Sequence, residues 1–202
     1  MSYDPNDLID DPIVFRKSRG ALIVSSSIAT DPIQLVRQVS HNELEVHLKN
    51  GHKYIEEVGE ADMYQIILEM MGYSPTELVL SFYCWPVCEE GKLKFLKGDA
   101  LRYAGEYALR DVFSHTPYMR SKFLDLSISF TEEKKKGYND IGYSSYNVLA
   151  TFRFTARVDM HKEIICRFEK IAWSSIVKTL FVGSPDAVHA NECYVNSIRK
   201  LE

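Results

Sequence analysis

The sequence predicts an α+β fold: a single domain over residues 21–202, with a mostly antiparallel sheet covered on one face by helices and a helical C-terminus. A flexible arm, acidic and then basic, is expected over residues 1–20. Segments 124–130 and 146–158 alternate apolar and polar residues with period two, which is typical of strands with one buried face. Residues 60–71 place apolar side chains at helical spacing. With 202 residues, 46% of them hydrophobic and 26% charged, the chain can bury a substantial core.

The arm is predicted from charge and from the lack of periodicity. The first fifteen residues contain four aspartates and no Lys or Arg, and basic residues begin at Arg16. Residues 21–28 predict the first strand. Residues 33–39 fit either a strand or a short helix, and both interpretations stay open.

Residues 43–58 predict a β-hairpin. Asn50 and Gly51 separate two alternating segments, and this dipeptide accepts positive φ at both central positions of a tight turn. A two-residue turn there places Val46 opposite Ile55.

Residues 60–71 predict an amphipathic helix. Glu60 and Asp62 fall in its first turn, where acids favour the helix dipole, and Gly72 can end it in a left-handed conformation. The apolar stripe is typical of a helix that packs on a core, and it consists of Met63, Ile66, Ile67, Met70 and Met71.

The centre of the chain predicts further strands and a second helix. Residues 76–85 are nearly apolar on both faces, as in a central strand, and residues 92–96 fit a short strand. A helix is expected over residues 99–113, capped by Asp99 and weakened in its middle by Gly105.

The two alternating segments should form antiparallel neighbours. The charged stretch 132–145 between them is interpreted as an exposed loop. After them, residues 164–180 carry a helical stripe, although 164–168 alone could extend the sheet. Ser184 and Pro185 then fit the N-cap and first residue of a second C-terminal helix.

Charge and targeting signals restrict the function classes. The net charge is −4, and residues 16–202 hold 24 basic and 24 acidic residues, which argues against nucleic-acid binding over a wide basic surface. The N-terminus does not resemble a signal peptide, and the longest apolar run is about half of the ~20 residues that a bilayer span needs. We expect a reduced, cytosolic environment. Local basic groups remain candidate contacts for anionic membrane or RNA: Arg16, Lys17, Arg19, Lys134, Lys135 and Lys136.

Motifs for catalysis or cofactor binding are absent from the sequence. It contains no phosphate-binding Gly-rich loop, no nucleophile elbow and no zinc-protease motif. Cys84, Cys88, His189 and Cys193 have metal-ligand chemistry, but Cys84 falls inside an apolar strand and the two pairs are far apart in sequence. We therefore expect no enzyme activity, no metal and no cofactor.

The order of the segments resembles the matrix proteins of rhabdoviruses over roughly residues 1–160. The similarity rests on Tyr-Asp-Pro-Asn-x-Leu at 3–8, Met-Tyr-Gln-Ile-Ile-Leu-Glu-Met-Met-Gly at 63–72 and Leu-Asp-Leu-Ser-Ile-Ser-Phe-Thr-Glu-Glu at 124–133. The chain departs from that family in its acidic first fifteen residues and in lacking a P-P-x-Y motif.

The resemblance implies a viral structural protein that self-associates and bridges the viral nucleoprotein–RNA complex, the ribonucleoprotein, to the inner membrane face. It would act in the virion and at membranes of the host-cell cytoplasm, with the nucleus as a further compartment. For self-association we expect an acidic group in the arm to dock on a basic surface of the next protomer. The acidic group is Asp4, Asp7, Asp10 and Asp11, and the basic surface is Lys92, Lys94 and Lys97. Two alternatives stay open: a ligand-binding module or enzyme with a pocket between helix and sheet, and a viral accessory protein that binds RNA or a host factor.

Overall fold

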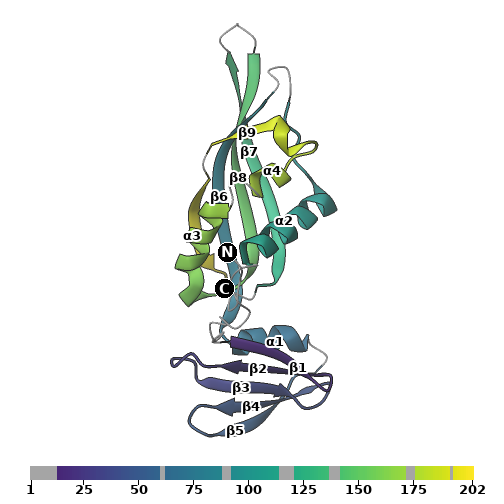
Figure 1. Ribbon diagram of the computed structural model, residues 1–202, viewed down its shortest axis with the longest axis vertical. Coiled ribbons are helices and arrows are strands. Elements are labelled where there is room, and N and C mark those ends of the chain that lie inside the picture. Colours follow the sequence, from purple (N-terminus) through teal and green to yellow (C-terminus); the bar gives the residue numbers. More distant parts are fainter. Residues whose placement is uncertain are drawn as a thin grey trace, which may run out of the picture. The chain divides into compact units, whose positions relative to one another are not determined.

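The computed structural model describes residues 13–59, 62–87, 92–113, 121–136, 142–171, 176–191 and 193–202. It confirms the predicted α+β class, with antiparallel sheets and helices (Figure 1). The sequence placed residues 21–202 in one domain, whereas the contacts divide the chain into two compact units, residues 1–73 and 74–202. Each unit has its own sheet and its own buried hydrophobic cluster.

The first unit is a five-stranded antiparallel sheet with one helix. The strands follow one another in sequence order across the sheet. Helix α1, Met63–Met70, contributes Ile67 and Leu68 to the cluster that covers one sheet face. The strands are β1 (Ile13–Ser18), β2 (Ala21–Ser26), β3 (Ile33–Gln38), β4 (Glu43–Leu48) and β5 (Lys53–Glu57).

Strand β1 corrects the predicted extent of the arm, because residues 13–18 pair with β2 along their whole length. Ile13 is fully buried. The turn between the strands is Arg19-Gly20, and both residues have positive φ, 50° and 83°. This is the two-residue hairpin geometry, and it is formed by a dipeptide that the sequence predicts to be part of the arm. Residues 1–12 of the predicted arm lie outside the described residues.

The β4–β5 hairpin forms as predicted, but its predicted register is wrong by one residue. Val46 lies opposite Tyr54, not Ile55. The Gly51 N–H donates to the Leu48 carbonyl at 3.0 Å, and the Leu48 N–H donates to the His52 carbonyl at 2.9 Å. The loop therefore has three residues and ends on Gly51 with φ 88°. A third loop residue shifts every cross-strand pair by one position.

Helix α1 forms where the apolar periodicity predicted it, within slightly shorter bounds. Asp62 is its N-cap rather than a first-turn residue, and the carboxylate accepts a hydrogen bond from the Tyr64 N–H at 3.1 Å. Gly72 follows the helix with φ 84°, as expected for its C-terminal end. Glu60 lies outside the described residues.

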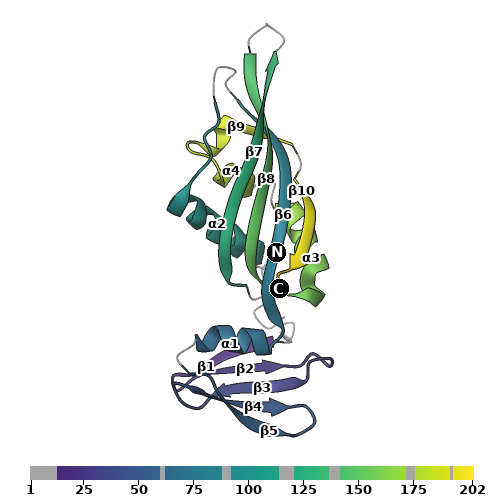
Figure 2. The same cartoon turned by 180° about the vertical axis from the view of Figure 1, so that it is seen from behind.

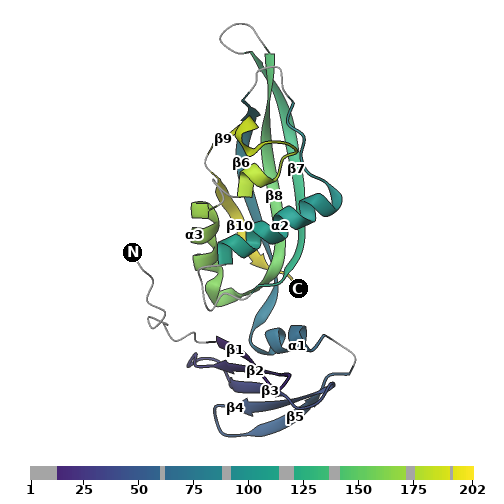
Figure 3. The ribbon, with the colours of Figure 1, turned by 45° about the vertical axis from the view of Figure 1, so that its right-hand side comes forward.

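The second unit has a four-stranded sheet of order β10-β6-β8-β7, and the short strand β9 pairs with one end of β6. The main connectivity is β6–α2–β7–β8–α3–β10, which with this order is the ferredoxin-like β-α-β-β-α-β arrangement (Figure 3). The elements are β6 (Tyr73–Pro86), α2 (Gly98–Phe113), β7 (Phe123–Lys136), β8 (Gly142–Arg157), α3 (His161–Ile171), α4 (Val177–Thr179), β9 (Val188–Ala190) and β10 (Tyr194–Lys200), with 3-10 turns at Val158–Met160 and Pro185–Ala187.

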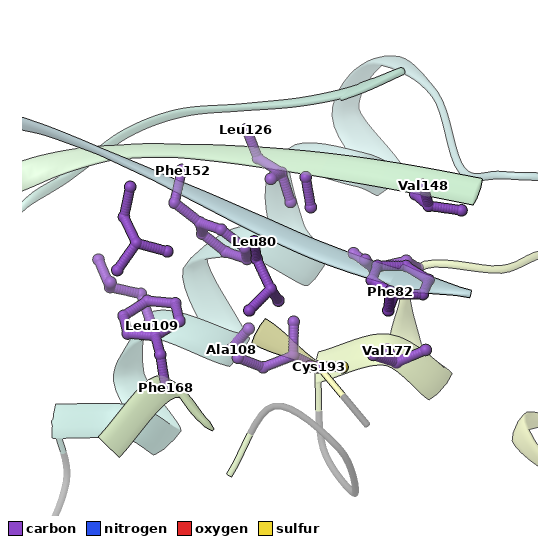
Figure 4. Close-up of a cluster of buried hydrophobic side chains, with 14 of the residues drawn as sticks. Leu80, Phe82, Ala108, Leu109, Leu126, Val148, Phe152, Phe168, Val177 and Cys193 are labelled. Atoms are coloured by element: carbon purple, nitrogen blue, oxygen red, sulfur yellow. The ribbon is translucent and has the colours of Figure 1, made fainter. Parts of the chain in front are cut away.

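Helices α2, α3 and α4 lie on one side of this sheet, and the view from behind presents the strands (Figures 1 and 2). Aromatic rings fill the space between helices and sheet. Phe168 of α3 lies 5.3 Å from Phe152 and 6.0 Å from Phe154 between ring centroids. Leucines and alanines of β6 and α2 complete this core, including Leu80 and Ala108 (Figure 4).

The predicted loop at 132–145 is wrong, because most of it belongs to β7 and β8. Their pairing continues as far as Lys136 opposite Gly142. Charged and polar residues occupy both faces of this end of the hairpin, so the apolar–polar alternation that predicts a strand is missing there. Residues 92–96 form no strand; Phe95 makes an isolated bridge to Phe181. Helix α2 begins at Gly98, so Asp99 lies in its first turn rather than at its cap.

The C-terminal prediction is partly wrong. Residues 164–168 belong to helix α3, which resolves the ambiguity between strand and helix. Ser184 caps a helical turn as predicted, but that turn is a 3-10 helix ending at Ala187. Residues 194–200 form edge strand β10 against β6, since pairing with a central strand overrides the weak local helical preference.

Candidate binding surface on the second sheet

The face of the second sheet that the helices leave uncovered is called the open face below. Successive side chains of a strand point to opposite faces. On β6, Phe82 and Cys84 belong to the core, so Tyr83 and Trp85 point to the open face and are half-buried there. The corresponding side chains on β8 and β7 are mostly polar: Tyr143, Ser145, Asn147, Leu149, Thr151 and Arg153, and Asp125, Ser127, Ser129, Thr131, Glu133 and Lys135.

A partly open groove of about 520 Å³ lies on the open face. Its volume is in the range of small-molecule sites. Its exposed lining is mostly apolar, with hydroxyl and amide groups among it, and the described lining residues carry no charge. The lining consists of Ser81, Phe82, Tyr83, Ser129, Phe130, Thr131, Asn147, Val148, Leu149, Asn191 and Tyr194.

Three aromatic side chains lie in a row at one end of the open face. The ring centroids of Tyr83 and Trp85 are 5.6 Å apart, and those of Trp85 and His189 are 5.7 Å apart. Pairing of β9 with β6 puts His189 opposite Trp85. The Lys135 Nζ lies 4.7 Å from the Tyr83 ring centroid, a cation–π contact, and the Tyr83 side chain raises the pKa of Lys135.

A carboxylate shared by two arginines lies at the other end of the sheet. Glu77 of β6 is only 6% exposed. It accepts hydrogen bonds from Arg199 Nη2 at 2.7 Å and from Arg153 Nε at 3.0 Å. Arg199, and then Arg153, hold the pKa of Glu77 below its ordinary value because they stabilise the charged form. This cluster joins β6, β8 and β10.

The predicted contact residues Lys134, Lys135 and Lys136 all lie exposed on β7. They do not form one patch, because neighbouring side chains of a strand point to opposite faces. Lys135 lies on the open face with Tyr83, and its Nζ is 3.7 Å from Glu133 Oε2. Lys134 and Lys136 point away from that face.

The predicted self-association residues Lys92, Lys94 and Lys97 are exposed on the segment between β6 and α2. Two backbone hydrogen bonds hold this segment to residues 180–182: Leu96 N–H to the Leu180 carbonyl at 2.9 Å, and Val182 N–H to the Lys94 carbonyl at 2.8 Å. Lys92 Nζ also approaches Glu132 Oε1 at 3.9 Å. The expected acidic partners, Asp4, Asp7, Asp10 and Asp11, lie outside the described residues.

The other predicted contact residues, Arg16, Lys17 and Arg19, are exposed in the first unit. Arg16 and Lys17 are consecutive in β1 and point to opposite sides of that sheet, and Arg19 lies in the turn that follows. The structure brings Arg16 and Lys17 to different faces rather than to one basic patch.

The cysteines considered as metal ligands belong to the core. Cys84 and Cys193 are buried, and burial raises the pKa of each thiol to about 12. His189 contacts Trp85 instead, and Cys88 lies outside the described residues. Across the described ranges, no group of three or more His, Cys, Asp or Glu side chains could hold a metal ion.

Sequence reasoning missed the aromatic row on the open face. Residues 76–85 read as apolar on both faces, so Tyr83 and Trp85 could not be separated from the core residues Phe82 and Cys84. The available signal was the polar tip of Tyr and Trp, which favours a half-exposed position. His189 is far away in sequence, and only strand pairing brings it to this row.

Comparisons with known proteins do not identify the chain. No helix in the described ranges is long and apolar enough to cross a membrane. No protein-family model matches the sequence, and no curated protein matches it.

Proposed function

We propose that this chain is a viral structural protein of the matrix type, without catalytic activity. It self-associates and links viral ribonucleoprotein to the inner face of a membrane, in the virion and at membranes of the host-cell cytoplasm. The observation that carries the proposal is the contrast between the two faces of the second sheet. One face is covered by a filled core, and the other offers an extended surface of exposed and half-exposed polar and aromatic side chains for contacts with other molecules.

The filled core favours this function over a ligand-binding module or enzyme with a pocket between helix and sheet. Phe152 is fully buried and its ring contacts Phe168 of α3 in the place where such a pocket would open. The groove of about 520 Å³ lies on the opposite face of the sheet and is partly open rather than enclosed. A surface of this kind suits macromolecular contacts.

Self-association is assigned to the exposed lysine segment and the acidic arm. Lys92, Lys94 and Lys97 are exposed on backbone that is hydrogen-bonded to residues 180–182, so their charges are presented by an ordered support. The first fifteen residues carry Asp4, Asp7, Asp10 and Asp11 and no Lys or Arg. Contacts between such opposite charges on two protomers are screened by salt.

Sedimentation velocity of the full chain at 50 and 500 mM NaCl tests this assignment. We expect assembly at low salt that weakens at high salt, and that is lost when Lys92, Lys94 and Lys97 are all replaced by Glu. The matched control is the triple change Lys162→Glu, Lys170→Glu and Lys200→Glu, which reverses three exposed lysines elsewhere on the second unit. Assembly that ignores salt, or that both triple variants weaken equally, contradicts the proposed interface. A chain that stays monomeric at millimolar concentration contradicts the proposed function.

Membrane contact is assigned to Arg16, Lys17 and Arg19, although Arg16 and Lys17 point to opposite sides of the first sheet, so that only one of the two can face a bilayer together with Arg19. Each basic residue near an anionic surface contributes about 1 kcal/mol of binding free energy. Flotation with vesicles that contain phosphatidylserine should therefore lose at least about tenfold in affinity when the three are changed to Gln. Vesicles of phosphatidylcholine alone are the control. Equal binding to both vesicle types would mean that charge does not drive membrane binding.

One observation favours the remaining alternative, an accessory protein that binds RNA or a host factor. Tyr83, Trp85 and Lys135 combine exposed aromatic surface with a cation on the open face. Such an RNA contact also fits a matrix-type protein that holds ribonucleoprotein.

A further inference from the structure

We infer that the open face of the second sheet is a binding site for single-stranded RNA, on which bases stack against Tyr83, Trp85 and His189. The inference deepens the proposed function, because it names the surface that would contact ribonucleoprotein. It rests on that function only for its biological setting. Binding of isolated RNA and self-association are measured separately, so either can fail without the other.

The aromatic row supplies the stacking surface. Tyr83 and Trp85 are half-buried, so each ring is held by the sheet while part of it faces outward. Their tilted arrangement with His189, at centroid distances of 5.6 and 5.7 Å, forms a continuous row. Each base that stacks on an aromatic side chain contributes binding with little sequence preference, because every base has a π face.

The adjoining groove supplies partners for base edges. Its hydroxyl and amide side chains, among them Ser129, Thr131 and Asn147, donate and accept hydrogen bonds and carry no charge. Tyr194, at 57% exposure, offers another ring at the groove wall. A chain leaving the aromatic row can therefore continue along the sheet over polar groups that match unpaired base edges.

The position of the row in the sheet is suited to this use. Tyr83 and Trp85 lie on β6, and the groove residue Asn147 lies on β8; these are the two central strands. A ferredoxin-like sheet with its helices on one side leaves central strands open on the other. Sheets of four strands that carry aromatic side chains on the open face stack two or three bases of single-stranded RNA.

Stacking, rather than charge, favours single strands over duplex on this face. Lys135, Arg153 and Arg199 on the open face are balanced by Asp125, Glu77 and Glu133. A balanced face gives little phosphate attraction to either form of RNA, since both are polyanions. Bases inside a duplex are also unable to stack on protein rings. Affinity should therefore rest on stacking and change little with salt.

Fluorescence anisotropy of the full chain with a labelled ten-nucleotide uridine RNA tests the inference. The test variant combines Tyr83→Leu and Trp85→Leu, which keep apolar bulk on the sheet. The control combines Tyr103→Leu and Tyr107→Leu, which remove two exposed tyrosines from helix α2 on the other side of the sheet. We expect the test variant to raise Kd at least about tenfold, and the control to leave it within twofold.

A spectroscopic readout reports the site directly. The chain has two tryptophans, so Trp173→Phe leaves Trp85 as the single one. Stacking of a base on Trp85 should quench its fluorescence as RNA is added, whereas a 20-base-pair duplex RNA should quench it little.

Several outcomes overturn the inference. One is the absence of RNA binding by the full chain. A second is an equal loss of RNA affinity in the test and control variants. A third is duplex RNA that binds as tightly as the single strand. Retained binding in the Tyr83/Trp85 variant that is lost with Lys134→Glu and Lys136→Glu would place RNA on the hairpin instead. The sedimentation experiment contains no RNA, so none of these results changes its outcome. It therefore tests the proposed function independently.

Discussion

Gly105 of helix α2 lies so close to Phe123 of strand β7 that a Cβ at position 105 would be 2.6 Å from the Phe123 Cε2 atom. The same added Cβ would lie only 3.0 Å from the Leu126 Cβ atom. The sequence suggested that this glycine weakens the helix. The structure gives the reason for its position, because the missing side chain lets the helix approach the sheet.

We expect Gly105→Ala to destabilise the protein by about 1–3 kcal/mol through overpacking. Helix propensity alone would stabilise it by up to about 1 kcal/mol, so the sign of the effect distinguishes the two interpretations. Urea unfolding measures it. Phe123→Leu added to Gly105→Ala makes room and should recover part of the loss. A Gly105→Ala variant that is more stable than the parent chain would show that this approach is not tight.

Glu77 should make stability depend on acid pH. Because the folded pKa is lowered, the unfolded chain binds the proton more tightly, and the contribution is complete above the unfolded pKa of about 4.3. It is then lost as pH falls through the lower folded value. Glu77→Gln should cost about 1–2 kcal/mol at pH 7 and reduce the slope of stability against pH below about 4.5.

Glu106→Gln is the control for Glu77, because its partner Arg102 is an exposed residue of the same helix. It should change stability by less than about 0.5 kcal/mol. An unchanged acid slope in Glu77→Gln would mean that the two arginines contribute little to the fold.

The core cysteines should be unreactive in the native state. Cys84 and Cys193 are buried and have pKa values of about 12, so almost no thiolate is present at pH 8. Iodoacetamide at pH 8 followed by peptide mass spectrometry should label both cysteines only after unfolding in urea. Exposed Cys166 is the internal control and should be labelled in the native chain. Labelling of Cys84 and Cys193 at the rate of Cys166 would contradict their burial.

The β4–β5 turn should tolerate change at one position and not at the next. Gly51 has φ 88°, a conformation that is costly for a side chain, so Gly51→Ala should destabilise by about 1 kcal/mol. The backbone at Asn50 does not have a positive φ. Its side-chain oxygen accepts a hydrogen bond from the His52 N–H at 3.0 Å. Asn50→Asp keeps that oxygen and should leave the thermal midpoint nearly unchanged. Equal losses in both variants would argue against the three-residue loop.

Several elements could be predicted because residues close together in the sequence determine them. The alternation in residues 146–158 fits β8, and the apolar stripe with Asp62 and Gly72 fits α1. Strand register could not be predicted at the β4–β5 hairpin, because one added loop residue changes every pair while the sequence around Asn50 stays equally compatible with both turns.

By itself, then, the sequence determined the α+β class, the main helices and the alternating strands, since hydrophobic periodicity records which face of an element is buried. Only the tertiary structure decided which strands became neighbours, and therefore which distant residues meet. Tyr83 and His189 are 106 positions apart, yet β9 pairs with β6 and brings them to one row. Strand pairing depends on contacts between distant parts of the chain, and no local pattern around Tyr83 or His189 encodes the other.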